Sequence, residues 1–483
     1  MVPTASELPV HFVPMSAVRE EFGGIDVAHR RPLGEVRKGY TSFLGGDVLF
    51  AKITPCMENG KLAIVPPLDD GLGFGSTEFH VLRPDDATCA KWLAYYLSQS
   101  EFRRFARQHM TGSAGQLRVS TSWLSKTNIP VAPVAEQTRI VAKLEELLSD
   151  LEAGVAELKA AQAKLARYRQ SLLKAAVDGA LTTDWRARHT PAETGAQLLA
   201  RILTERRARW EDKQRARFAA QGKTPPKNWQ AKYPEPVAPD TTELPALPEG
   251  WVWASLSQVG WLDRGRSKHR PRNAPHLYGG RYPFVQTGDI RHSETFISEA
   301  EATYSEAGLA QSRLWPIGTM CITIAANIGK TAILSVEACF PDSVVGFLPA
   351  SDEVSVRYVE FSMRSVQRTL EAEAPATAQK NINLEILEKV VVPIPPPREQ
   401  CQIVEVLDHL LTAGTENDHA IEHALKQSAA QRKNLLKAAF SGQLVPQDPA
   451  DEPASVLLER IRAERETRGA VKRRRRPKPG VLA

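Results

Sequence analysis

The sequence repeats one long pattern. AEQTRIV at 135–141 recurs as REQCQIV at 398–404, and SLLKAAV at 171–177 recurs as NLLKAAF at 434–440. Both pairs lie 263 positions apart (399 − 136 and 437 − 174). A fixed offset over this length indicates a duplicated unit, and two long copies predict paired domains rather than an array of short repeats. We expect a pseudo-two-fold molecule that reads an object with two halves.

The bulk composition indicates an ordinary globular protein. A chain of 483 residues favours roughly three domains, and a hydrophobic share of 42% is normal. No run of about 18 apolar residues predicts a membrane span, and the first seven residues do not resemble a signal peptide. The cysteines are odd in number and never spaced Cys-x-x-Cys, which argues against disulfides and zinc ribbons and favours the cytoplasm: Cys56, Cys89, Cys321, Cys339 and Cys401.

Residues 1–134 and 244–397 share one local pattern. Short apolar runs, broken by Gly, Pro and Asp, predict strands between turns. Two longer segments, 90–99 and 356–371, read as short helices. Each region is therefore expected to be a mixed α/β globule. The clearest predicted strands are 47–53, 79–82, 282–285, 320–324 and 251–256.

The pattern becomes continuously helical after each globule. From 136 to about 178, leucines recur one heptad apart, which predicts a coiled-coil seam on a helix about 64 Å long. The second copy keeps this frame less strictly, and we expect the two helices to pack against each other. The predicted seam positions are Leu144, Leu151, Leu158, Leu165 and Leu172, then Leu407, Gly414, Ile421, Ser428 and Leu435. A second stripe is predicted at Leu147, Gly154, Ala161, Tyr168 and Ala175, and at Leu410, Ala424 and Ala438.

A second helix follows each long one. Residues 194–218 form a charged amphipathic pattern, echoed at 455–461, and 223–248 form a Pro-rich connector expected to be flexible or extended. The predicted boundaries are 1–135 for the first globule, 136–185 for its long helix, and 186–243 for the amphipathic helix and connector. They continue with 244–397 for the second globule, 398–446 for its long helix, and 447–483 for a short helix and basic tail.

Basic residues concentrate in loops of the globules. The net charge of +6 favours a polyanion partner, and Arg, Lys and Asn can bind phosphates and base edges. The basic tail at 472–478 fits either a solvated end or non-specific nucleic-acid binding. The candidate DNA-binding residues in the first globule are Arg30, Arg31, Lys38, Tyr40, Thr41, Lys52, Asn59 and Lys61. Those in the second are Arg264, Arg266, Lys268, Arg270, Arg272, Asn273, Thr287, Arg291, His292 and Lys330.

No catalytic constellation emerges. Residues 326–331 resemble the end of a phosphate-binding loop, but Ile324 stands where the pattern needs its first glycine, so a β-turn is favoured. His419 and His423 fit an inverted zincin pattern on a helix, yet they fall outside the predicted seam and lack a third ligand, which favours a solvated face. We predict no catalytic residues, no metal and no cofactor held by this chain.

Several motifs together resemble the specificity subunits of type I restriction–modification systems. They are LPEGW at 247–251, VVPIPPPREQ at 391–400 and LLKAAFSGQL at 435–444, with first-copy counterparts at 128–137 and 172–181. The resemblance implies two α/β target-recognition domains, each reading half of a split DNA sequence, separated by two long antiparallel coiled-coil helices. It also implies that the subunit is non-catalytic.

The same resemblance implies the partners. Two modification subunits would dock along the helices and use S-adenosylmethionine, and motor-nuclease subunits would use ATP and Mg. Two other classes stay open: a non-catalytic coiled-coil DNA-binding scaffold outside restriction–modification, and a phosphate-loop enzyme.

The first copy begins late relative to the second. Trp251 precedes Phe284 by 33 residues, whereas Phe12, aligned with Phe284, has only 11 residues before it. We expect the first globule to be N-terminally shortened by roughly 22 residues (33 − 11). Either the true start lies upstream, which we favour, or this reader is a shortened form.

Overall fold

The chain forms two compact units, each containing one globule and part of both long helices. The computed structural model describes residues 6–84, 87–113, 115–325, 327–373 and 381–474. Unit 1 comprises residues 1–160 and 421–483, and unit 2 comprises 161–420. The division therefore differs from the three domains suggested by length, because the long helices belong to both units. Within the described residues, no helix is long and apolar enough to cross a membrane.

The first globule contains two small sheets. The four-stranded sheet has the order β2-β1-β6-β3, with β1 and β6 parallel, and the three-stranded sheet has the order β5-β4-β7 and is antiparallel. The strands are β1 (Pro9–Val13), β2 (Arg30–Pro32), β3 (Thr41–Leu44), β4 (Val48–Ala51), β5 (Leu62–Ile64), β6 (Leu72–Gly75) and β7 (Phe79–Leu82). The helices are η1 (Met15–Ala17), α1 (Leu33–Val36), α2 (Ala87–Ser98), α3 (Ser100–Gln108) and α4 (Thr121–Leu124).

The second globule is built around a five-stranded sheet of order β11-β14-β13-β15-β9, with β10-β12 and β16-β8 as separate pairs. Its strands are β8 (Val252–Ser255), β9 (Gly260–Arg264), β10 (Tyr278–Phe284), β11 (Phe296–Ile297), β12 (Ala302–Tyr304), β13 (Met320–Thr323), β14 (Thr331–Leu334), β15 (Val344–Pro349) and β16 (Val391–Ile394). Its helices are α8 (Leu256–Val259), η4 (Pro275–Leu277), α9 (Thr287–His292), α10 (Glu306–Ala310), α11 (Val356–Glu373) and α12 (Leu384–Glu388).

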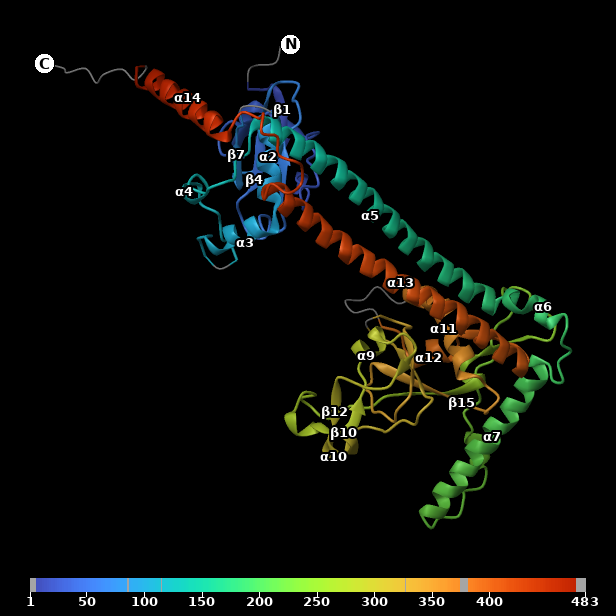
Figure 1. Cartoon of the computed structure of the whole chain (residues 1–483). Coiled ribbons are helices and arrows are strands. Elements are labelled where there is room, and N and C mark those ends of the chain that lie inside the picture. Colours follow the sequence, from blue (N-terminus) through green and yellow to red (C-terminus); the bar gives the residue numbers. More distant parts are fainter. Residues whose placement is uncertain (1–5, 85–86, 114, 326, 374–380, 475–483) are drawn as a thin grey trace. The chain divides into compact units, whose positions relative to one another are not determined.

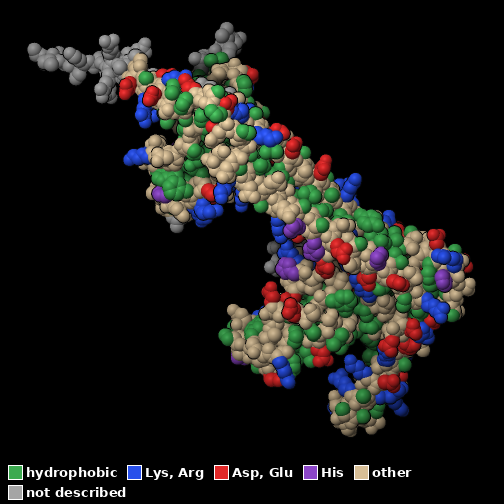
Figure 2. Space-filling view, viewed as in Figure 1, with side chains coloured by type: hydrophobic (Ala, Val, Ile, Leu, Met, Phe, Trp, Pro, Cys, Tyr) green, Lys and Arg blue, Asp and Glu red, His purple; other side chains and the backbone are tan. Residues whose placement is uncertain are grey.

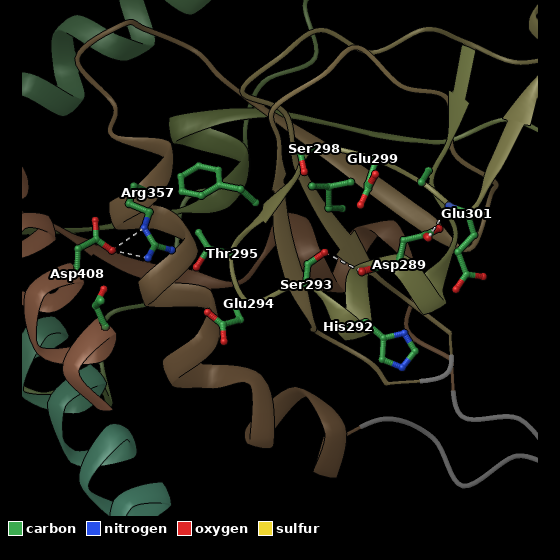
Figure 3. A pocket seen from close by; sticks show the side chains of 14 residues that line it. Asp289, His292, Ser293, Glu294, Thr295, Ser298, Glu299, Glu301, Arg357 and Asp408 are labelled. Atoms are coloured by element: carbon green, nitrogen blue, oxygen red, sulfur yellow. Dashed lines mark hydrogen bonds and ion pairs between the residues drawn. The ribbon is translucent and has the colours of Figure 1, made fainter. Parts of the chain in front are cut away.

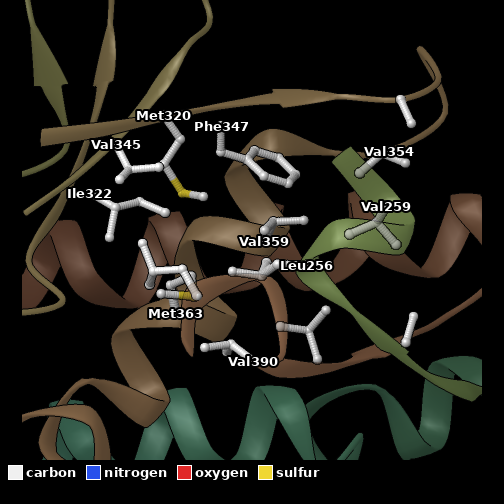
Figure 4. Packing of buried hydrophobic residues seen from close by; sticks show 14 of the residues in the cluster. Leu256, Val259, Met320, Ile322, Val345, Phe347, Val354, Val359, Met363 and Val390 are labelled. Atoms are coloured by element: carbon white, nitrogen blue, oxygen red, sulfur yellow. The ribbon is translucent and has the colours of Figure 1, made fainter. Parts of the chain in front are cut away.

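The core of the second globule lies between this sheet and the helices α8 and α11. Met320, Ile322 and Val345 project from β13 and β15 against Leu256 and Val359, and all five are fully buried (Figure 4). Burying a side chain of this size contributes about 1.5–3 kcal/mol. This core fixes the sheet edge from which the loop after β9 departs.

The two globules share part of their framework. β14-β13-β15 repeats the order and antiparallel pairing of β5-β4-β7. In each copy a buried aromatic side chain donates a hydrogen bond to an equivalent proline carbonyl. Trp92 Nε1 donates to Pro130 O at 3.0 Å, and Tyr358 OH donates to Pro393 O, 263 positions later in the chain, at 2.9 Å. The duplication seen in the helices therefore extends to the globules.

The long helices are α5 (Val134–Val177) and α13 (Pro397–Phe440) (Figure 1). In unit 1, the start of α5 packs against the end of α13, with Leu144 against Leu436 in one apolar cluster. In unit 2, the end of α5 packs against the start of α13, with Leu172 against Leu407. The helix segments are therefore antiparallel within each unit.

The second stripe predicted on α5 is wrong at Gly154, Ala161 and Tyr168, whereas the positions predicted on α13, Leu410, Ala424 and Ala438, are half-buried. Gly154 and Tyr168 are exposed, whereas Leu148 and Val155 turn inward. On the inward face of α5, each leucine of the heptad repeat is accompanied by the residue four positions after it, not by the residue three positions after it. The residues that line the faces are Leu144, Leu148, Leu151, Val155, Leu158, Gln162, Leu165, Arg169, Leu172 and Ala176, and Leu407, Leu411, Gly414, Asp418, Ile421, Leu425, Ser428, Arg432, Leu435 and Ala439.

The segment that follows each long helix is bonded to the start of the other long helix. Glu399, at the start of α13, is 1% exposed and accepts hydrogen bonds from Thr182 Oγ1 at 2.7 Å, Arg186 Nη1 at 2.5 Å and Trp251 Nε1 at 2.9 Å. Thr182 and Arg186 lie in η2 (Ala180–Thr182) and α6 (Thr183–Arg186). The start of α5 is held likewise by Arg139, which pairs with Asp451 after α13.

The segments after these contacts are also helical. α7 (Gly195–Ala220) begins with a capping box of Thr194 and Gln197, and α14 (Ala454–Arg474) is its counterpart. The connector after α7 is extended, as expected, but it is not free. Trp229 in η3 (Trp229–Lys232) and Tyr233 are buried against α7. The last part of the predicted basic tail, residues 475–478, lies outside the described residues.

Candidate nucleic-acid interface

The basic loop of the second globule, residues 264–273, forms what we call the basic ridge. Exposure alternates along it, because Gly265 and Ser267 are buried while their neighbours face solvent. Gly265 N bonds Val344 O at 2.9 Å, and an added Cβ there would lie 2.3 Å from Phe340 O. The ridge therefore lies directly on the backbone of the sheet, where only glycine fits. Its exposed cations are Arg264, Arg266, Lys268, Arg270 and Arg272.

Side-chain and backbone bonds fix the ridge along its length. Arg266 N bonds Phe340 O at 3.0 Å, Ser312 Oγ bonds Arg266 O at 2.7 Å, and His269 N bonds Gln311 Oε1 at 3.0 Å. These bonds order the loop before any ligand arrives. A preordered loop loses little conformational entropy on binding.

The cations of the ridge differ in how they are held. Arg272 pairs with Asp342 at 2.8 Å and Arg266 lies 3.9 Å from Asp263, in half-exposed pairs that contribute little energy. Arg270 donates to carbonyls of its own loop. Arg264, Lys268 and Asn273 have no ion pair or side-chain bond to other described residues. These three are the ridge positions most available to a ligand.

The remaining candidates of unit 2 divide between surface and interior. Arg291 and His292 are exposed at the end of α9, and Thr287 is half-buried at its start. Lys330 is half-buried, and desolvation lowers its pKa, with the nearby Arg364 adding to the shift. Lys330 is therefore placed beside buried Glu360 rather than at the ridge.

A hollow of about 920 Å³ beside α9 does not suit phosphate. Asp289, Glu294, Glu299 and Glu301 line it, and Arg357 at its rim is already paired with Asp408 at 2.5 Å (Figure 3). Carboxylates repel a polyanion. His292 faces this hollow, so its position does not support a role in DNA binding.

In unit 1, a smaller set of candidates gathers around β2 and β3. The Arg31 guanidinium lies 4.4 Å above the Phe12 ring, and Tyr40 meets the same ring edge-on at 4.9 Å. Lys38 is exposed nearby and has no ion pair with described residues. Arg30 differs, because Asp69 and Asp70 hold it at 2.7 and 2.9 Å; Thr41 begins β3 and is half-buried.

The other three candidates of unit 1, Lys52, Asn59 and Lys61, lie in the segment between β4 and β5. Asn59 Nδ2 donates to Glu20 Oε1 at 2.8 Å, and Lys61 Nζ donates to Met15 O at 3.1 Å. Lys52 is half-buried. The structure thus separates these residues from Arg31, Lys38 and Tyr40.

The two alternative motifs lie in a turn between strands and on an exposed helix face. Gly329, with φ 73°, lies between antiparallel strands β13 and β14, and Gly60, with φ 69°, lies between β4 and β5. Both are turns, and neither precedes a helix as a phosphate-binding loop does. His419 and His423 are exposed on α13, and no group of metal-ligating side chains is found in the described part of the chain. Cys56, Cys89, Cys321, Cys339 and Cys401 all lie in the described part of the chain, and no disulfide joins them.

One exposed surface was missed by the sequence reasoning. Phe105 on α3 is 48% exposed, and its ring contacts His109 at 4.6 Å and Trp123 at 5.5 Å. Arg104 is exposed next to it. The sequence does contain Phe105 and His109 four residues apart, a spacing that places both on one face of a helix, but the same spacing is also typical of a buried helix face.

Comparisons with known proteins agree on one family. A model described as the type I restriction modification DNA specificity domain matches residues 32–159 and 248–427. The specificity subunit of the type I restriction enzyme EcoEI from Escherichia coli is 26% identical over 462 residues, covering 84% of this chain and 74% of that protein. The EcoAI specificity subunit, also from Escherichia coli, is 30% identical over 295 residues, covering 52% of this chain and 47% of the relative.

A solved structure has a similar fold. It comes from work on complex assembly and conformational transition of the type I R-M system, and it aligns with a TM-score of 0.65. The alignment covers 91% of this chain and 93% of the other at 20% identity. At this identity, the likeness shows the fold alone.

Proposed function

This chain belongs to the family of type I restriction–modification DNA specificity domains, and we propose that it selects the bipartite DNA sequence on which such an enzyme acts. As a specificity subunit it is itself non-catalytic. A coiled-coil DNA-binding scaffold outside restriction–modification is not favoured, because the family match covers both copies of the repeat.

One observation carries the proposal of two half-sites. The two globules keep the same framework bonds, from Trp92 to Pro130 and from Tyr358 to Pro393, yet present different loops. The first presents Arg31, Lys38 and Tyr40 around β2 and β3, and the second presents the basic ridge. A shared frame with different loops is what two readers of different sequences need, since loops determine binding while the frame determines their position.

The partners and cofactors follow as further proposals. Two modification subunits would supply S-adenosylmethionine chemistry, and motor-nuclease subunits would use ATP and Mg. This chain would hold none of these cofactors. Because the DNA substrate lies in the cytoplasm of a bacterial cell, the proposal implies that location for the chain.

Mapping of methylated adenines tests the proposal. Host DNA is sequenced for methylation in strains with the gene, without it, and with the gene restored. We expect one split sequence motif that loses methylation on deletion and regains it on restoration. A methylation map that is the same in all three strains would refute the proposal.

A further inference from the structure

Helix α7 changes character half-way along its length. Its first half packs into the core of the second globule through Leu198, Leu199 and Ile202, all buried. The outer half of α7 extends away from that core, and the connector that follows the helix runs back beside it (Figure 1). We call residues 207–236 the arm.

The arm has its own aromatic packing. Trp210 stacks on Trp229 at 5.8 Å and meets Tyr233 edge-on at 5.4 Å, and Phe218 contacts Trp229 at 6.1 Å. At the base, buried Arg206 donates to Tyr233 OH at 2.6 Å and lies 3.7 Å over the Trp261 ring. The returning chain is tied to the globule, with Val237 N bonded to Ser257 Oγ at 3.0 Å. These contacts hold the two sides of the arm together from its base as far as Phe218 and Trp229.

Charge is balanced near the base of α7 but not in the outer part. Arg201 pairs with Glu193 at 2.8 Å and with Glu205 at 3.1 Å, and Arg207 pairs with Glu211. From 213 to 234 the sequence has six cations and no Asp or Glu. Arg215 pairs back with Glu211 and Asp212. The other five are exposed and have no ion pair with described residues (Figure 2): Lys213, Arg217, Lys223, Lys227 and Lys232.

The absence of an apolar patch distinguishes between classes of partner. Within the arm, no large hydrophobic side chain is exposed among the described residues. A protein interface has a buried core of aromatic and aliphatic side chains, whereas contact with phosphates requires only cations and donors. An ordinary solvated surface would carry acids among its lysines, as the inner half of α7 does among its arginines.

We propose that the arm binds the sugar–phosphate backbone of DNA without reading bases. This inference rests on the proposed function, and it adds a contact outside the basic ridge and the loops of the globules. Each cation that neutralises a phosphate releases a counterion, so log K falls with log salt by about 0.9 per contact. If three of the five cations contact phosphate, the arm contributes about 2.7 to the slope.

The test uses the full chain assembled with its partner subunits. In one variant, Lys213, Arg217, Lys223, Lys227 and Lys232 are all replaced by Gln. In the matched control, the four lysines are replaced by Arg, which keeps the charge. Binding to a target duplex and to a scrambled duplex of equal length is measured by fluorescence anisotropy between 50 and 200 mM KCl. Tryptophan fluorescence of the unbound proteins checks that the arm remains folded.

We expect the Gln variant to bind both duplexes at least about tenfold more weakly at 100 mM salt, with a slope smaller by about 2–4. The ratio between target and scrambled duplex should stay unchanged, and the Arg control should bind like wild type. An unchanged slope in the Gln variant overturns the proposal. So does a variant that assembles poorly but keeps its DNA slope, since the arm would then be a protein-docking surface. Failure of the wild type to prefer the target would instead contradict the proposed function.

Discussion

At the scale of single residues, the basic ridge shows why exposed cations are not equivalent. Arg270 and Arg272 are exposed like Lys268, but both already have partners. Arg270 donates to a carbonyl of its own loop, and Arg272 pairs with Asp342. Lys268 has no such partner among the described residues. Availability therefore depends on neighbours brought in from distant segments.

Lys268→Ala should weaken DNA binding by removing one phosphate contact. The salt slope is expected to fall by about 0.9, with little change in sequence preference. Lys268→Arg serves as the control and should restore binding. Equal slopes for wild type and Lys268→Ala, measured by anisotropy over a salt series, would show that Lys268 does not contact DNA.

His80 should make unit 1 sensitive to acid. Its ring is buried and Nε2 lies 2.8 Å from Val119 O, and burial lowers the pKa of His80 below its ordinary 6.5. As pH falls through 6.5, the unfolded chain takes up a proton that the folded chain still refuses, so stability decreases until the folded-state pKa is reached. The loss is about 1.4 kcal/mol for each unit between the two pKa values.

Denaturation at pH 7.5 and 5.5 tests this expectation. His80→Gln keeps a donor for Val119 O but cannot titrate, so its unfolding free energy should fall less than that of wild type. His409→Gln, at an exposed position on α13, should behave like wild type. If His80→Gln loses as much stability as wild type between the two pH values, His80 is not the source.

At the scale of elements, the heptad pattern predicted one of the two buried rows of α5 correctly and the other only in part. The leucine stripe of α5 lies on its buried face, but Gly154, Ala161 and Tyr168 of the second stripe face solvent. The reason is geometric, because residues three and four positions away both lie near the same face. Only the partner helix decides which of the two is covered.

Two glycines in these helices should respond oppositely to alanine. An added Cβ at Gly154 meets nothing within 4 Å, so Gly154→Ala should stabilise α5 by about 1 kcal/mol. At Gly414 the added Cβ lies 3.2 Å from Arg169 Nε, whose side chain also pairs with Asp418 at 2.5 Å. Gly414→Ala should therefore gain less or lose stability. Thermal denaturation of both variants checks this, and equal gains would contradict the packing at Gly414.

At the scale of the whole molecule, the duplication suggests that the two readers can be exchanged independently. Replacing residues 1–134 with the first globule of a relative should change one half-site of the methylated motif and leave the other unchanged. The junction precedes Glu136 and Gln137, so the framework bond from Gln137 Nε2 to Ala132 O must be rebuilt by the incoming segment. Methylation mapping is the readout, and a change in both halves would contradict one reader per half-site.

The sequence by itself determined the repeat, the two long helices, the α/β character of each globule and the family resemblance. These features depend on periodicity and on motifs that are contiguous in the chain. Only the tertiary structure decided which cations are available, because Asp69, Asp342 and Glu360 approach Arg30, Arg272 and Lys330 from distant segments. It also decided that the connector packs against α7, since Trp229 and Tyr233 contact Trp210 and Arg206 from a segment that composition alone predicts to be flexible or extended.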